Sequence, residues 1–259
     1  MVSRDTSIDS FMFRFINICF YITTVVFTAF FSCTNNQNAG KQQPEEGEYF
    51  IKKTTDFEIS GAGAAKNWET VSWLVIPKRS TAGDNYETKV KLLYSANGIY
   101  FLYSCNDRKL TNTMQMDFLD LWNEDVIEIF LQPDESNPAY FEYELSPLDF
   151  ELPIIIFNEQ GKLNSWIPFH YEDERKTRHS TSIAGGEKKP GGLAKNWMAE
   201  VFIPFALMKP VLKTLPASGT RWKGNLYRID YDEGEALWSW KPNSGNFHEY
   251  DKFGSFRFE

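Results

Sequence analysis

The chain has 259 residues, a formal net charge of -8 and 16% aromatic residues. The acidic balance argues against nucleic acid as a partner, because the phosphate backbone attracts basic surfaces. The 3 histidines and 3 cysteines have no metal-ligand spacing, which argues against a zinc site. The length after a leader suits a single all-β domain with a sizeable core.

The N-terminal residues 1–33 have the pattern of an export signal. Arg14 precedes an apolar stretch over residues 15–31, and Ser32 and Cys33 then lead into a polar segment. Cys33 resembles the lipidated cysteine of bacterial lipoproteins, and Met12 is an alternative start. An uncleaved membrane anchor is the other interpretation, since an apolar run of about 18 residues can just span a bilayer. Both interpretations predict a membrane-attached protein outside the cytoplasm, at the outer membrane or cell surface.

Residues 34–48 are predicted to be a polar linker, because they contain too few apolar side chains to fold. The remaining residues, 49–259, are predicted to form one antiparallel β-sandwich, jelly-roll-like, because short alternating segments recur between turn signals such as Asn97-Gly98. Strands are expected at 88–95, 99–105, 126–132, 139–145, 153–157, 197–203, 226–231 and 255–258. Residues 205–212 are expected to form one or two helical turns.

The segment 126–131 has a carboxylate in the middle of an apolar strand. Side chains alternate along a strand, so Ile127, Ile129 and Leu131 are expected on one face, with Val126, Glu128 and Phe130 on the other. A carboxylate there needs water or a hydrogen-bond donor, and a sugar hydroxyl is one such donor. A solvated strand position is the simpler interpretation of Glu128.

Several segments, in chain order, resemble the family 9 carbohydrate-binding modules. The resemblance rests on segments 89–94 and 97–103 with Asp107, on 121–130, on 197–205, on 225–229, and on 238–242 and 247–256. It covers residues 49–259, nearly the whole mature chain. It implies a β-sandwich that binds an oligosaccharide or polysaccharide without catalysis, in support of polysaccharide catabolism. Glycoside hydrolases and glycan importers are possible partners.

The resemblance also implies a site in which two tryptophans clamp the flat faces of a terminal sugar while charged groups bind its hydroxyls. Trp122 and Trp240 match the clamp positions, and Trp238 is the alternative to Trp240. Glu128 lies six residues after Trp122, as in the family, and Arg228 matches a sugar-binding arginine of the family. One such clamp with two charges predicts micromolar to millimolar affinity.

Each of these residues also has a purely structural interpretation. A tryptophan in a sandwich more often belongs to the core, and Trp240 could pack over the end of the sandwich. Arg228 could form an ion pair with Glu128 or Asp230. The family also carries a polar group such as Arg after the acidic strand, whereas residues 140–147 here offer acids and aromatics. The identity of the sugar is therefore open.

Three further hypotheses concern metal, catalysis and haem. Structural calcium, which such modules often hold, could bind the loop carboxylates Asp117, Asp120, Glu124 and Asp125, although these lack an ordered ligand spacing. A glycoside hydrolase would need two carboxylates across a cleft, for which Glu124, Glu128, Glu142, Glu144 and Asp149 are available. A haem-binding sandwich would use axial ligands such as Met114, Met116 or His179.

Overall fold

The computed structural model describes residues 47–169 and 172–259, which belong to a compact unit spanning Gln43–Glu259. The predicted export signal, its Cys33 and residues 34–46 of the predicted linker lie outside the described residues. None of the helices in the described ranges has the length and apolar character needed to cross a membrane.

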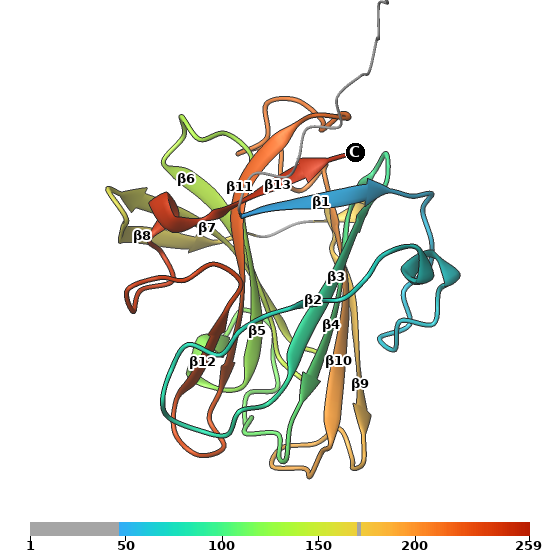
Figure 1. Ribbon diagram of the computed structural model, residues 1–259, viewed down its shortest axis with the longest axis vertical. Coiled ribbons are helices and arrows are strands. Elements are labelled where there is room, and N and C mark those ends of the chain that lie inside the picture. Colours follow the sequence, from blue (N-terminus) through green and yellow to red (C-terminus); the bar gives the residue numbers. More distant parts are fainter. Residues whose placement is uncertain (1–46, 170–171) are drawn as a thin grey trace, which may run out of the picture. The chain divides into compact units, whose positions relative to one another are not determined.

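Strands make up most of the described secondary structure and fall into two groups (Figure 1). Sheet A has the spatial order β8 (Lys162–Pro168), β7 (Glu151–Glu159), β6 (Ala139–Leu145), β5 (Val126–Gln132), β11 (Arg221–Asp230) and β13 (Gly254–Phe258), and β12 (Ala236–Ser239) also pairs with β11. Sheet B consists of β3 (Thr88–Tyr94), β4 (Gly98–Asn106), β10 (Asn196–Pro204) and β9 (Arg178–Ala184), with β2 (Leu74–Val75) on β3.

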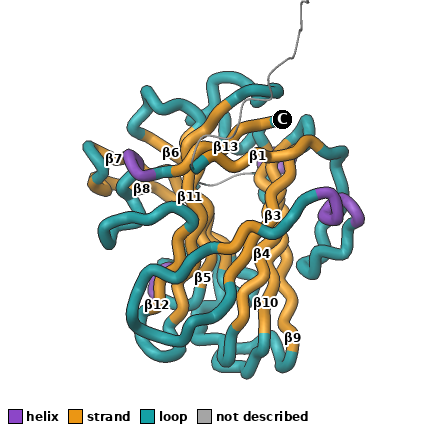
Figure 2. The backbone as a smooth tube through the Cα atoms, in the orientation of Figure 1, coloured by secondary structure: helices purple, strands orange, loops and turns teal. Residues whose placement is uncertain are grey.

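Strand β1 (Glu48–Lys53) joins the two groups into one curled sheet. Its first four residues pair with β13 and its last two residues pair with β3, in both cases parallel. The predicted all-β sandwich is therefore confirmed, but the sheet is mixed rather than wholly antiparallel. Figure 2 shows that the helical segments are short turns; these are η1 (Lys66–Thr70), η2 (Leu121–Asn123), η3 (Asp173–Arg175) and η4 (Tyr250–Lys252).

The eight expected strands all form, some with longer ends than predicted, while β1, β2, β8, β9 and β12 had no expected counterpart. The segment 205–212 contains hydrogen-bonded turns, such as Met208 N–H to Phe205 O at 3.1 Å, without a regular helix. The inner faces of the two sheets share one core, to which β5 contributes Ile127, Ile129 and Leu131 as expected.

The outer face of sheet A carries a second apolar cluster, to which Val126, Phe130, Tyr140, Ile154 and Tyr227 belong. Partly buried side chains from η2, from β8 and from the connection between β12 and β13 pack against it. Gly245 in that connection has a φ of +107°, a conformation that glycine adopts without a steric penalty. These covering segments leave part of the outer face open, and that opening is the site described next.

Candidate functional site

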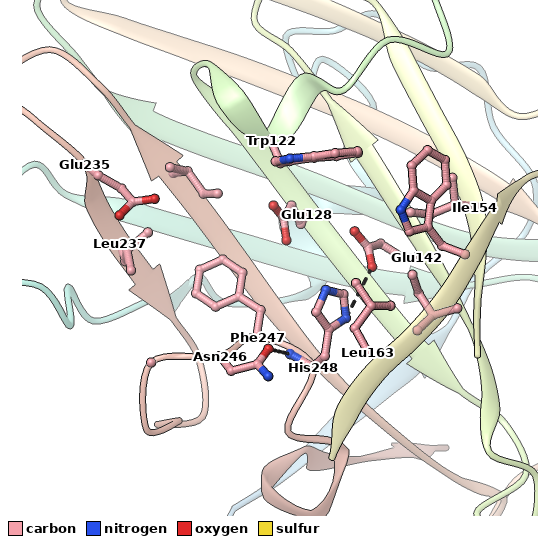
Figure 3. Close-up of a pocket in the computed structure, with 14 residues that line it drawn as sticks. Trp122, Glu128, Glu142, Ile154, Leu163, Glu235, Leu237, Asn246, Phe247 and His248 are labelled. Atoms are coloured by element: carbon pink, nitrogen blue, oxygen red, sulfur yellow. Dashed lines mark hydrogen bonds and ion pairs between the residues drawn. The ribbon is translucent and has the colours of Figure 1, made fainter. Parts of the chain in front are cut away.

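A pocket of about 370 Å³ lies on the outer face of sheet A (Figure 3). Its lining comes from η2, β5 to β8, β11, β12 and the β12–β13 connection, and consists of Trp122, Glu128, Glu142, Ile154, Ile156, Leu163, Trp166, Ile229, Glu235, Leu237, Gly245, Asn246, Phe247 and His248. We call it the outer pocket. A concave, mostly apolar pocket with a few converging polar groups is the usual form of a small-ligand site.

Glu128 and Glu142, which line the outer pocket, and Glu144 behind them form what we call the acidic floor. Glu128 on β5 is the register partner of Glu144 on β6, and Glu142 lies two residues before Glu144 on the same face. The three are 3%, 4% and 0% exposed, respectively. Both carboxylate oxygens of Glu144 and Oε2 of Glu142 are buried without a hydrogen-bond partner. The simple expectation of a solvated Glu128 is therefore wrong.

Burial dominates the electrostatics of the acidic floor, because a buried carboxylate loses the solvation of its charge. It raises the pKa of Glu142 to about 8. It also raises the pKa values of Glu128 and Glu144 well above their usual range, and the neighbouring carboxylates raise them further. The floor therefore binds protons at neutral pH when no cation is present.

Aromatic rings form the walls above this floor. Figure 3 shows Trp122 on one side of the Glu128 carboxylate and Phe247 on the opposite side. Trp122 is held by η2, and its carbonyl accepts a hydrogen bond from the Tyr231 hydroxyl at 2.9 Å. Phe247 stacks on Tyr227 with ring centroids 4.0 Å apart, and the Tyr227 hydroxyl donates to the Phe247 carbonyl at 2.8 Å. Both walls are thus fixed by contacts beneath them.

His248 lies next to Phe247 at the edge of the floor. Its Nδ1 is 2.7 Å from the Tyr140 hydroxyl and 3.8 Å from Oε2 of Glu142. Burial lowers the pKa of His248 to about 4, so the ring is neutral at physiological pH. Asn158 holds the backbone in place by donating its side-chain amide to the His248 carbonyl at 2.7 Å.

Of the residues expected to bind ligand, Trp122 and Glu128 meet in the outer pocket and Trp240 does not join them. Trp240 is 9% exposed and stacks on Phe256 in the core, with centroids 4.9 Å apart. The expected pairing of Trp122 with Trp240 is thereby corrected. The reason is strand pairing. The backbone N–H of Trp240 donates to the Leu226 carbonyl of β11 at 2.9 Å, which extends the pairing of β12 with β11 to this residue.

Trp238, the alternative partner, is also in the core, at 1% exposure, and its indole N–H donates to the Tyr86 carbonyl at 3.0 Å. Residues two apart on a strand share a face, which turns Trp238 and Trp240 inward together. Leu237, between them, points outward and lines the pocket.

Arg228 is fully buried on the inner side of β11, so its expected role in the site is corrected as well. It bonds to Asp230 Oδ2 at 2.6 Å and Asp107 Oδ2 at 3.1 Å, and its guanidinium lies 5.0 Å from the Trp238 ring. The alternative of an ion pair with Asp230 is confirmed. Tyr227, its neighbour on the strand, is the residue that pairs with Glu128 across the sheet.

The sequence interpretation missed Phe247, His248 and Trp166 as lining residues, and it assigned Glu142 only to the hydrolase alternative. Phe247 and His248 lie inside the C-terminal segment 247–256 that carried the family resemblance, so a signal was present. Trp166 lies in β8, a strand with exposed and half-buried residues that gave no clear alternation.

Two of the loop carboxylates considered for calcium accept hydrogen bonds from the backbone. Glu124 accepts hydrogen bonds from the backbone of Thr113 and Met114 at 2.7 and 3.0 Å. Asp125 accepts from Tyr231 N–H at 2.8 Å. Within the described ranges, the one acidic group with metal-like spacing is Asp107, Asp125 and Asp230, whose oxygens lie within 4.8 Å of one another. Because Arg228 already supplies a cation to Asp107 and Asp230, this group does not fit a calcium ion.

The haem alternative finds no support in the placement of its residues. His179 contacts two carboxylates, with Nδ1 3.0 Å from Asp149 and Nε2 3.6 Å from Glu151, and Met116 is an exposed side chain. None of Met114, Met116 and His179 lines the outer pocket.

Comparison with known proteins was made for both sequence and structure. The family model described as "Carbohydrate family 9 binding domain-like" matches residues 59–215. The curated proteins gave no significant sequence match. Among solved structures, a protein from Bacteroides uniformis, provisionally assigned as carbohydrate-binding, has a TM-score of 0.68 at 16% identity, covering 82% of this chain and 99% of its own.

Two further similar structures are of a family 9 carbohydrate-binding module from Caldicellulosiruptor kristjanssonii. The complex of that module with cellotriose has a TM-score of 0.56 at 18% identity and covers 82% of this chain and 93% of its own. The glucose complex has a TM-score of 0.57 at 18% identity and covers 82% of this chain and 95% of its own. At these identities the likeness establishes the sandwich fold.

Proposed function

Because the chain belongs to the carbohydrate family 9 binding domain-like family, we propose that it binds the end of a glycan chain in the outer pocket. The single observation that carries this proposal is the placement of Trp122 and Phe247 on either side of the Glu128 carboxylate (Figure 3). The Caldicellulosiruptor module of the same family has been solved with glucose and with cellotriose, which supports a sugar as the ligand class.

The geometry suits a pyranose for physical reasons. A sugar ring has apolar faces that pack on aromatic rings, and hydroxyls at its edge that need hydrogen-bond partners. Trp122 and Phe247 supply the two flat surfaces, and Glu128, Glu142 and Asn246 supply polar groups between and below them. The proposed clamp therefore has a phenylalanine in place of the second tryptophan expected from the sequence.

The proposal includes a supporting role in polysaccharide breakdown and a location outside the cytoplasm. The export-like pattern of residues 1–33 and the cysteine at position 33 support attachment through a lipid, with glycoside hydrolases or glycan importers as neighbours. Incorporation of labelled fatty acid into the wild type, and its loss in Cys33→Ala, would test the anchor. Equal labelling of both proteins would contradict it.

Glycoside hydrolysis is the alternative function, since Glu128 and Glu142 both line the outer pocket. Hydrolysis needs one protonated carboxyl group and one ionised carboxylate. Burial raises the pKa values of both groups here, which disfavours the ionised partner. Release of reducing sugar that is lost in Glu128→Gln, while binding persists, would establish the enzyme; binding without turnover supports the binding role.

The test of glycan binding is an array probed with the full chain and two variants. Trp122→Ala is expected to lose binding, because it removes one wall of the pocket. Trp73→Ala is the matched control, since Trp73 is a half-buried tryptophan packed on the outer face of sheet B. Binding that survives in Trp122→Ala, or is absent from the wild type on every glycan, would overturn the proposal.

A further inference from the structure

The acidic floor gathers several buried carboxyl groups with no basic side chain of the pocket lining to pair with them. The outer pocket is lined by Glu128, Glu142 and Glu235, and its lining contains no lysine or arginine. Glu144, directly opposite Glu128 across β5 and β6, adds a fourth carboxyl group behind the lining. The only basic ring in the lining is His248, which burial keeps neutral by lowering its pKa to about 4.

The carboxyl groups of the floor are also short of hydrogen-bond donors. Oε2 of Glu142 accepts no hydrogen bond of normal geometry although the residue is only 4% exposed and lines the cavity. The residue contacts the Glu144 carboxyl group and, through Oε2, His248 Nδ1 at 3.8 Å. Buried polar atoms are nearly always paired, and a buried acceptor without a donor is destabilising. Figure 3 shows the carboxyl groups of Glu128 and Glu142 in the space between Trp122 and His248, where a ligand would lie.

We propose that the outer pocket selects a sugar carrying a free ammonium group, which would bind the carboxylates of Glu128 and Glu142. This inference rests on the proposed carbohydrate binding and specifies its ligand class. An ammonium offers three N–H donors and one positive charge, so it supplies both of the things that the floor lacks. Its positive charge also offsets the repulsion between neighbouring carboxylates. Without a cation, the same carboxyl groups have to bind protons.

A metal ion fits the floor less well than an ammonium. A divalent cation needs several oxygens gathered around one point. In the part of the chain that the structure describes, only Asp107, Asp125 and Asp230 bring such oxygens within 4.8 Å of one another, and the three floor glutamates do not. An ammonium can be bound by two carboxyl groups, and Glu128 and Glu142 both line the pocket.

The experiment compares three sugars of nearly equal shape on the full chain. Glucosamine, glucose and N-acetylglucosamine are titrated by calorimetry at neutral pH, where most of the amine is protonated and the acidic floor has fewer protons to release than at acidic pH. Glucosamine is expected to bind on the order of tenfold more tightly than the other two, because hydrogen bonds to charged groups are stronger than those between neutral groups. N-acetylglucosamine has the nitrogen without the charge and therefore isolates the effect of the ammonium.

Two isosteric variants show whether the floor is responsible. Glu142→Gln is expected to abolish the preference for glucosamine over glucose and N-acetylglucosamine. Glu69→Gln is the matched control, because it makes the same substitution at an exposed residue of η1 outside the pocket lining. A preference that persists in Glu142→Gln would overturn the inference. Thermal unfolding of both variants confirms that they are folded.

The remaining outcomes separate this inference from the proposed function. Equal affinity for all three sugars, lost in Trp122→Ala, would overturn the ammonium selectivity and leave carbohydrate binding intact. A calcium titration that gives heat with the wild type and none with Glu142→Gln would overturn it in favour of a metal. Lack of binding by every sugar tested, amino sugars and oligomers included, would overturn both proposals.

Discussion

The indole rings of Trp122 and Trp166 meet edge to face, with centroids 5.5 Å apart and an interplanar angle of 80°. Trp122 lies in η2 before β5, an interior strand of sheet A, and Trp166 lies in β8, an edge strand of that sheet. The contact therefore links the loop that supplies one wall of the outer pocket to the edge strand of the sheet. We therefore expect Trp166 to position the Trp122 ring.

Replacement of Trp166 tests this link. Trp166→Ala is expected to weaken sugar binding about two- to tenfold, because an aromatic pair contributes about 0.5–1.5 kcal/mol beyond its buried area. Trp166→Phe should retain most of the affinity, since it keeps an aromatic edge against Trp122. Both variants are measured by titration with a sugar that binds the wild type. Equal weakening by Phe and Ala would contradict the positioning role.

Replacement of Trp240 separates the expected clamp from the observed core. Trp240→Ala is expected to lower the free energy of unfolding by about 3–5 kcal/mol, because it leaves a cavity against Phe256. Urea denaturation measures the loss. Trp240→Phe, which keeps more of the packing, should bind sugar as the wild type does. Loss of binding in Trp240→Phe without loss of stability would restore the clamp expected from the sequence.

The buried ion pairs of Arg228 predict a large loss of stability when the arginine is removed. Arg228→Met leaves Asp107 and Asp230 buried without their cation and should cost about 3–5 kcal/mol in unfolding free energy. Arg108→Met, at an exposed ion pair with Glu233, is the control and should change little. Chemical denaturation at neutral pH compares the two. Similar stability of both variants would show that the aspartates are satisfied in another way.

Glu142 should make the protein less stable as the pH rises. Its pKa is about 8 in the folded state, against about 4.3 for an unfolded glutamate, so the folded state holds a proton that the unfolded state releases. The free energy of unfolding is therefore expected to fall progressively between about pH 4.3 and 8. Glu142→Gln should flatten this decline and be more stable than the wild type at neutral pH. A parallel pH profile for both proteins would contradict the assignment.

His179 has a raised pKa for a different reason. Burial lowers the pKa of His179, but its hydrogen bonds to Asp149 and Glu151 and their charges outweigh burial and raise it to about 9. A histidine pKa that is higher in the folded state than in the unfolded state stabilises the folded state. This stabilisation is fully present below about pH 6.5 and is lost as the pH rises toward 9. His179→Gln should therefore differ most from the wild type near pH 6 and least above pH 9. Denaturation across this range measures the difference.

Local patterns in the sequence were sufficient for the fold class and for half of the site. Strict alternation in 126–131 placed Ile127, Ile129 and Leu131 in the core and Glu128 on the other face, as observed. Trp122, which was expected at the site, lines the outer pocket. Such patterns are readable because the side chains of one strand depend only on its own period and on which face is buried.

The second wall and the acidic floor depend on contacts between distant segments, so only the tertiary structure could decide them. Trp240 became a core residue because its segment pairs with β11, and Phe247 reached the pocket because the following connection folds back over the outer face of sheet A. Glu128, Glu142 and Glu144 gather because β5 and β6 pair in one register. Whether a carboxylate is buried depends on the segments that cover it. A local sequence pattern does not contain that information.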